Sequence, residues 1–189
     1  MKDCIYINPD NIAKEKFGDW NSQKAVLEAA QYAEKVRDLC LEKGRSLAFE
    51  TVFSIADKVE FIQRAKKIGY FVRLFFVGTD HPAINAARIT KRVMEGGHDV
   101  PITKIISRYS KSISNCAIAS LVADRTYVYD NSIDGRQPEL MFRSKNGEMA
   151  KIYCPIHSWA DEIVLTLEAH NKLKSTPVPI DPKYSCPNP

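Results

Sequence analysis

The feature that most constrains the fold is the apolar segment 71–77 in the middle of the chain, which reads Phe-Val-Arg-Leu-Phe-Phe-Val. Seven mostly apolar residues that end at Gly78 are typical of a strand covered on both faces. Sheets built from such strands are mainly parallel, and helices connect the strands and cover the sheet. The segment therefore predicts a sheet whose strands alternate with helices along the chain.

Shorter apolar runs and amphipathic stretches alternate on both sides of this segment. The other predicted strands are 4–7, 46–49, 126–129 and a hairpin within 135–153 that turns at Asn146-Gly147. The predicted helices are 21–43, 57–68, a helix that carries Arg88, 102–122 and 158–173. This order predicts a three-layer α/β domain with a largely parallel sheet over residues 1–173, followed by an extended Pro-rich tail over 174–189.

Polar side chains come directly after three of the predicted strands. Asp10 follows the first strand and a proline, and we expect it on a loop. Glu50 and Thr51 follow the second strand, and Asp130 and Asn131 follow a later one. Ligands of α/β proteins bind at the carboxyl ends of the strands, so these residues are candidates for a binding site. Turn or helix-capping roles are the alternative for each of them.

Cations with few acidic neighbours stand on two consecutive predicted helices. Arg88 and Arg92 are one turn apart on the first helix, and Arg108 is on the second. Like charges at this spacing repel each other unless an anion lies across them, and guanidinium groups suit phosphate oxygens. Gly96 and Gly97 separate the helices, which favours a hinged lid that closes over phosphates. A solvated helix face is the alternative.

Composition excludes several classes of protein. The net charge of +4, from 27 basic and 23 acidic residues, is too small to indicate a nucleic-acid partner. The five cysteines are scattered and form no Cys-x-x-Cys pair, so we expect neither a disulfide framework nor a zinc site, and we expect a reducing cytoplasm. The histidines have no partner at metal-ligand spacing. No apolar run is long enough to predict a membrane span.

The motif that usually holds the phosphates of ATP is missing from the sequence. A P-loop reads Gly-x-x-x-x-Gly-Lys-[Ser/Thr], and none of the 8 glycines precedes a lysine. The nearest approach, Gly44-Arg45-Ser46, has Leu39 at the place of the first glycine. Phosphoryl transfer by these residues alone would lack the amide cradle that positions the phosphates.

Seven short motifs in a fixed order nevertheless resemble those of the zeta-toxin-like family of P-loop kinases. The motifs lie at 8–10, 49–54, 69–70, 92–93, 96–101, 108–109 and 130–132. The resemblance covers residues 5–132 and depends mainly on Glu-Thr-Val-Phe-Ser and Gly-Gly-His-x-Val-Pro occurring in that order.

The resemblance implies a P-loop-kinase-like α/β fold with a helical lid, to which this chain adds a small C-terminal hairpin and helix. It implies an ATP- and Mg²⁺-dependent kinase that phosphorylates a hydroxyl of a small molecule. In characterised zeta toxins that molecule is a UDP-activated amino sugar of cell-wall synthesis. It also implies an antitoxin protein as partner, and we expect no nucleic-acid or membrane partner.

Roles for single residues follow from the same resemblance. Asp10 would be the base toward the substrate hydroxyl, and Glu50 and Thr51 would hold substrate or organise magnesium. Arg92 and Arg108 would stabilise the transferred phosphoryl group. Two further assignments are Arg88, which competes with Arg92 for the first lid role, and Asn131, which would contact the nucleotide.

The chain departs from the family at its start, because the strand, P-loop and helix that should precede residue 4 are missing. We therefore expect an N-terminally shortened and inactive kinase. The alternative is a non-catalytic relative that keeps the substrate and lid half as a binding or regulatory module.

Overall fold

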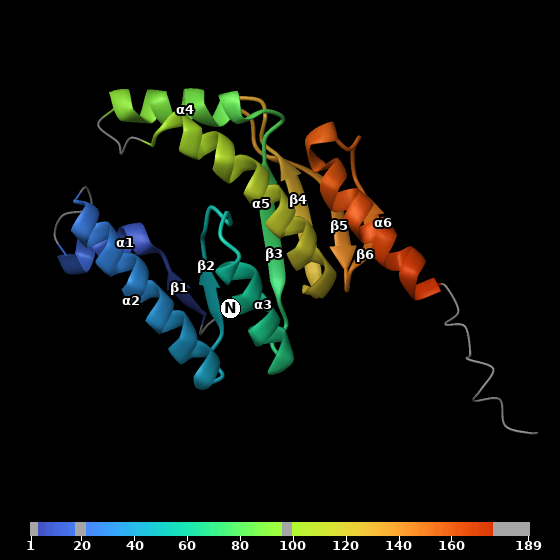
Figure 1. Cartoon of the computed structure of the whole chain (residues 1–189), viewed down its shortest axis with the longest axis horizontal. Helices are drawn as coiled ribbons and strands as arrows, with labels where there is room; N and C mark the ends of the chain where they lie inside the picture. Colours follow the sequence, from blue (N-terminus) through green and yellow to red (C-terminus); the bar gives the residue numbers. More distant parts are fainter. Residues whose placement is uncertain (1–3, 18–21, 96–99, 176–189) are drawn as a thin grey trace, which may run out of the picture. The chain divides into compact units, whose positions relative to one another are not determined.

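The computed structural model describes residues 4–17, 22–95 and 100–175 (Figure 1). The elements are β1 (Ile5–Ile7), α1 (Pro9–Phe17), α2 (Gln23–Glu42), β2 (Leu47–Phe49), α3 (Asp57–Lys67), β3 (Arg73–Gly78), α4 (Pro82–Met94), α5 (Ile102–Val122), β4 (Arg125–Asp130), β5 (Glu139–Lys145), β6 (Glu148–Ile152), a short 3₁₀ helix η1 (Ser158–Ala160) and α6 (Asp161–Ser175). The chain divides into two compact units. Unit 1 is residues 1–52 with 89–100, and unit 2 is residues 53–88 with 101–189.

Unit 1 is built on a pair of parallel strands, β1 and β2, in which Ile7 lies opposite Phe49. Helices α1 and α2 pack against each other, and α2 also contacts β1. The fully enclosed core is small and centres on Ile7, Ala33 and Cys40. Helix α2 follows the prediction closely, because the hydroxyl of Ser22 caps its start by accepting the amide of Ala25 at 3.1 Å.

The prediction that Asp10 lies on a loop is wrong, because Asp10 is in the first turn of helix α1. Pro9 ends the strand and also begins the helix, where its missing N–H costs no hydrogen bond. The side-chain oxygen of Asn8 accepts the amides of Asp10 at 2.9 Å and Asn11 at 3.3 Å. The helix of nine residues that follows the proline is absent from the predicted elements, although a helix-capping role is the alternative for Asp10.

Unit 2 contains a four-stranded sheet in the order β3-β4-β5-β6. Strands β3 and β4 are parallel, and the hairpin adds β5 and β6 in antiparallel orientation. Helices α3, α5 and α6 supply one side of the core, with α5 and α6 packed side by side (Figure 1). The predicted hairpin turn is confirmed, with φ of 51° at Asn146 and 79° at Gly147.

The outer face of β3 is not covered as its sequence predicts. Phe76 is 8% exposed and belongs to the core that the helices close. Phe75 and Val77, which point to the other face, are 59% and 53% exposed. Phe75 stacks on Tyr127 of β4, with ring centroids 4.9 Å apart. The expectation of two covered faces is therefore wrong for this side of unit 2, because the helices of its core lie against the other side.

The predicted α/β class is confirmed, and its parallel pairs are β1–β2 and β3–β4. The last helix continues to Ser175, two residues beyond the predicted end, and the rest of the Pro-rich tail lies outside the described residues. The Gly96-Gly97 hinge also lies outside them. Within the described parts of the chain, no helix has the length and apolar character needed to cross a membrane.

Candidate functional site

The carboxylates of Asp10 and Glu50 lie at the carboxyl end of the parallel pair in unit 1. Strand β1 ends at Ile7, three residues before Asp10, and β2 ends at Phe49, directly before Glu50. Since Ile7 and Phe49 lie opposite each other in parallel strands, β1 and β2 end at the same edge of the pair. This is the edge at which the strand pattern expects ligand-binding groups. Thr51, also in unit 1, is exposed beside Glu50.

Tyr6 connects the two strands at this edge, a contact that the sequence did not reveal. Its hydroxyl donates to Oε1 of Glu50 at 2.8 Å, and Nδ2 of Asn8 donates to the same hydroxyl at 3.2 Å. Oε2 of Glu50 and the carboxylate of Asp10 have no hydrogen-bond or ion-pair partner among the described residues. The edge therefore offers acceptor oxygens to a ligand that donates hydrogen bonds. The only signal in the sequence was the period-two alternation that turns Tyr6 away from the buried Ile7.

The three arginines differ in their surroundings. Arg88 is in unit 2 and pairs with Asp134, with 3.6 Å between Nε and Oδ1, so it has an acidic partner that the sequence reasoning missed. Arg92 lies one helical turn further along α4, is exposed and belongs to unit 1. Arg108 is half-buried on α5 in unit 2, and it makes no hydrogen bond or ion pair with any residue that the structure describes. A half-buried cation without a carboxylate partner is available to an anionic ligand.

A buried network closes the carboxyl ends of β3 and β4 in unit 2. Asp130 is 8% exposed, and its carboxylate accepts the hydroxyl of Ser132 at 2.6 Å and Nε1 of Trp159 at 2.9 Å. Burial raises the pKa of Asp130, but these bonds and the amide of Ser132 outweigh burial and hold the pKa below its ordinary value. The amide of Asn131 donates to the carbonyl of Gly78 at 2.8 Å. Asn131 itself is half-buried at this edge.

The same network fixes the loop that leads from β3 to α4. The hydroxyl of Tyr109 donates to the carbonyls of Thr79 at 2.8 Å and Asp80 at 3.2 Å. Burial, together with the charges of Asp80 and Asp130, raises the pKa of Tyr109, which keeps its hydroxyl a donor. Ser132 accepts the amide of Asp80 at 2.8 Å. Tyr109 thus anchors the turn of α5 that carries the neighbouring Arg108, a role that the sequence reasoning did not assign to it.

The residues present do not fit the triphosphate of ATP, because the 189 residues contain no glycine-lysine pair that could form a P-loop. For magnesium, the carboxylate of Glu50 and the hydroxyl of Thr51 are oxygen donors of a suitable kind. In the part of the chain that the structure describes, no three His, Cys, Asp or Glu side chains gather into a metal site. The described carboxylates therefore offer hydrogen-bond acceptors to a ligand, and the 189 residues hold no P-loop motif for phosphates.

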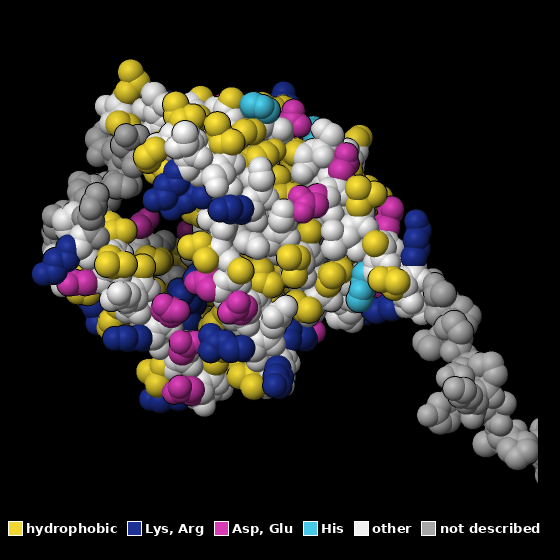
Figure 2. All heavy atoms as spheres, in the orientation of Figure 1, with side chains coloured by type: hydrophobic (Ala, Val, Ile, Leu, Met, Phe, Trp, Pro, Cys, Tyr) yellow, Lys and Arg dark blue, Asp and Glu magenta, His cyan; other side chains and the backbone are white. Residues whose placement is uncertain are grey.

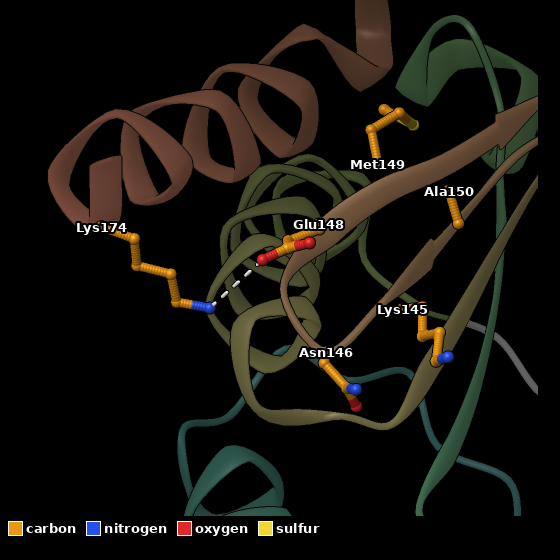
Figure 3. A pocket seen from close by; sticks show the side chains of 6 residues that line it. All are labelled: Lys145, Asn146, Glu148, Met149, Ala150 and Lys174. Atoms are coloured by element: carbon orange, nitrogen blue, oxygen red, sulfur yellow. Dashed lines mark ion pairs between the residues drawn. The ribbon is translucent and has the colours of Figure 1, made fainter.

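A hollow in unit 2 lies near the start of β4, at the opposite end of that strand from Asp130. It is lined by Lys145, Asn146, Glu148, Met149, Ala150 and Lys174 (Figure 3). Glu148 and Lys174 form an exposed ion pair across it at 3.7 Å. Lys145 pairs with Arg125 at the start of β4, whereas Asp130 is at the end of that strand. Over the face seen in Figure 2, acidic and basic side chains are interspersed with hydrophobic ones.

Comparison with known proteins identifies the family. A protein of Haemophilus influenzae (strain ATCC 51907 / DSM 11121 / KW20 / Rd), described as uncharacterized, is 28% identical over 105 residues, which are 56% of this chain and 74% of that protein. A solved chain from the PezAT chromosomal toxin-antitoxin system of the human pathogen Streptococcus pneumoniae has a similar fold. Its TM-score is 0.51 at 13% identity, over 92% of this chain and 77% of that chain. The family model described as Zeta toxin matches residues 4–144, and the chain therefore belongs to the zeta-toxin family.

Proposed function

We propose that Asp10, Glu50 and Thr51 form the substrate side of an ATP-dependent kinase. This kinase phosphorylates a hydroxyl of a small molecule, with a UDP-activated amino sugar as the substrate class. The observation that carries the proposal is the pair of carboxylates, Asp10 and Glu50, at one strand edge of a zeta-toxin-family chain. Their free oxygens accept hydrogen bonds, which suits a ligand rich in hydroxyl and amide groups.

Each residue has a distinct task in this proposal. Asp10 accepts the proton of the attacking hydroxyl, and Glu50 and Thr51 bind donor groups of the substrate. Arg108 stabilises charge on the transferred group, and Arg92 assists it. In addition, Arg88 is the alternative to Arg92, although its ion pair with Asp134 competes with that role, and Asn131 contacts the nucleotide.

ATP and Mg²⁺ would supply the phosphoryl group and neutralise its charge when bound. The 189 residues include no P-loop, so ATP binding needs a phosphate-binding loop from outside them. An antitoxin protein is the proposed partner, supported by the family and by the similarity to a chain of a toxin-antitoxin system. The proposal places the protein in a reducing cytoplasm, which the free thiols of Cys4, Cys40, Cys116 and Cys154 support.

The second candidate is a non-catalytic module that binds the same substrate without transferring phosphate. It is favoured by the same lack of a P-loop motif in the sequence. Both candidates require substrate binding at Asp10 and Glu50, and they differ in whether any protein containing these residues turns over ATP.

Calorimetric titration of the purified chain with UDP-N-acetylglucosamine tests the proposal. Glu50→Gln should weaken binding about 10-fold, because the hydrogen bonds that this side chain accepts lose their charged acceptor. Arg108→Ala should change affinity less than about 2-fold, because its contribution belongs to the transition state. Glu34→Gln, on the exposed surface of α2, is the matched control and should bind as the wild type does.

A phosphate-release assay with magnesium and ATP completes the experiment. The 189-residue chain should show no turnover above background, because positioning and charge stabilisation of the phosphates are nearly the whole of this chemistry. Turnover by the chain would contradict the proposed division between substrate and nucleotide sides. Absence of UDP-sugar binding in the wild type would contradict the substrate class.

A further inference from the structure

We propose that Tyr6 and Asn8 are positioning residues that fix the direction of the Glu50 carboxylate and determine which of its oxygens meets the ligand. This inference rests on the proposed function for the identity of the ligand, but the positioning itself is a property of unit 1. Neither residue was a candidate from the sequence. The three side chains form one hydrogen-bonded row from Asn8 through Tyr6 to Glu50.

The backbone amides at the start of α1 determine which atom is the donor in each hydrogen bond of this row. Oδ1 of Asn8 accepts two backbone amides, those of Asp10 and Asn11, so this atom must be the oxygen of the side-chain amide. The other atom, Nδ2, is then a donor, and it points to the hydroxyl oxygen of Tyr6 at 3.2 Å. Since Tyr6 accepts on that side, its own proton is free to be donated to Oε1 of Glu50 at 2.8 Å.

The position of Tyr6 shows that this bond is not a by-product of core packing. Tyr6 is 53% exposed, whereas the next residue, Ile7, is 2% exposed and belongs to the core. An exposed phenol can donate to water at no cost, yet this one bridges two strands to a residue 44 positions away. A charge-assisted bond of this kind holds a long, exposed Glu side chain in one orientation.

This hydrogen bond leaves one oxygen of the Glu50 carboxylate for a ligand. Oε1 of Glu50 is occupied by Tyr6, while Oε2 and the Asp10 carboxylate are free among the described residues. A ligand group at this edge must therefore be a donor, as a sugar hydroxyl or an acetamido N–H is. A phosphate or carboxylate would be repelled by the carboxylates of Glu50 and Asp10. Tyr6 and Asn8 thus favour the sugar end of a UDP-sugar at this edge over its diphosphate.

Carbon-13 NMR of the Glu side-chain carboxyl groups tests the positioning without any ligand. The Glu50 signal is the one that disappears in Glu50→Gln. Tyr6→Phe, which removes only the hydroxyl, should shift this signal, and Asn8→Asp should also shift it by changing the donor at Tyr6 into an acceptor. Tyr32→Phe is the matched control: Tyr32 is an exposed tyrosine of unit 1 whose hydroxyl accepts from Lys16 at 2.6 Å, and its loss should leave the Glu50 signal unchanged.

Titration with UDP-N-acetylglucosamine then tests the effect on recognition. Tyr6→Phe should weaken binding about 5-fold, and it should cause little further loss in the Glu50→Gln background, because the two side chains act as one unit. Additive losses, or a Glu50 signal that Tyr6→Phe does not move, would overturn the inference. A moved Glu50 signal in a chain that binds no UDP-sugar would support the positioning and count against the proposed function alone.

Discussion

Gly78, the last residue of β3, shows how one missing methyl group shapes this fold. A Cβ built at this position would lie 2.3 Å from the nearest atom of the Trp159 ring. The indole cannot easily retreat, because it is 7% exposed and its Nε1 donates to Asp130. The close packing of the ring on the backbone thus depends on glycine at the end of the strand.

Gly78→Ala should therefore destabilise the protein by about 1–3 kcal/mol, the usual cost of overpacking a filled core. Urea unfolding followed by circular dichroism measures the change in the free energy of unfolding. Val77→Ala is the control one position earlier, at an exposed side chain, and should cost less than about 1 kcal/mol. If Gly78→Ala unfolded at the wild-type urea concentration, the indole would be more mobile than described.

For single residues, the sequence predicted where a side chain lies better than it predicted which side chain it forms a hydrogen bond with. The strand ends predicted where Glu50 would lie, because that follows from a local pattern. The bond from Tyr6 to Glu50 and the bond from Trp159 to Asp130 join residues 44 and 29 positions apart. Such pairings depend on the register of strands and loops, which periodicity does not encode. The roles of the site residues remain predictions.

Three elements of unit 2 meet at Asp124, which lies two residues after the end of α5. Its carboxylate accepts from Nζ of Lys66 on α3 at 2.8 and 2.7 Å, and from the amide of Val72, just before β3, at 2.7 Å. Burial raises the pKa of Asp124, but these donors outweigh burial and hold the pKa below its ordinary value of 3.8. The folded state thus favours the charged form of this carboxyl.

Asp124→Asn should lower the free energy of unfolding by about 2 kcal/mol at pH 7, since it weakens bonds to a charged acceptor. A carboxyl whose pKa is lowered by folding stabilises the fold above its ordinary pKa. That stabilisation is lost as the pH falls through the still lower pKa of the folded state. The difference between wild type and variant should therefore shrink below pH 3.8.

Urea titrations at pH 7 and pH 3 measure this difference. Asp134→Asn, at a side chain that is 79% exposed and pairs with Arg88, should cost under about 0.5 kcal/mol at pH 7. A variant deficit that stayed constant with pH would mean that the charge of Asp124 is not what stabilises the junction.

Helices with long periodic patterns were predicted well, whereas the short helix α1 was not. The apolar periodicity of α5 gave its limits as observed, because that helix repeats over 21 residues. Helix α1 has only nine residues and begins at a proline, so its pattern was too short to separate from a loop. The outer face of β3 was misjudged because an apolar sequence shows what a strand can bury and not what covers it.

The whole molecule comprises two units with very different cores. Unit 2 encloses large side chains such as Phe142, Met141 and Ile163, whereas the enclosed core of unit 1 centres on Ile7, Ala33 and Cys40. Stability rises with the apolar area that is buried, so unit 1 should be the less stable of the two. The α/β class was predictable from the order of strands and helices, but this division was not, because it depends on how much surface each part buries.

Urea should accordingly unfold unit 1 before unit 2. In a Trp20→Phe chain, Trp159 is the remaining tryptophan, and its fluorescence reports on the core of unit 2. Helices α1 and α2 contribute to the far-ultraviolet circular dichroism, so part of that signal should be lost at a lower urea concentration than the fluorescence. Coincident transitions by the two probes would instead show that the chain unfolds as one cooperative body.

The exposed face of β3 has a practical consequence for work with this protein. Phe75 and Val77 lie on a strand at the edge of its sheet, where unpaired backbone groups and apolar side chains are presented together. Self-association through such a strand depends on the frequency of encounters between molecules. We therefore expect dilution to limit self-association of this chain, and we expect the edge of the sheet, more than the stability of the fold, to set the highest usable protein concentration.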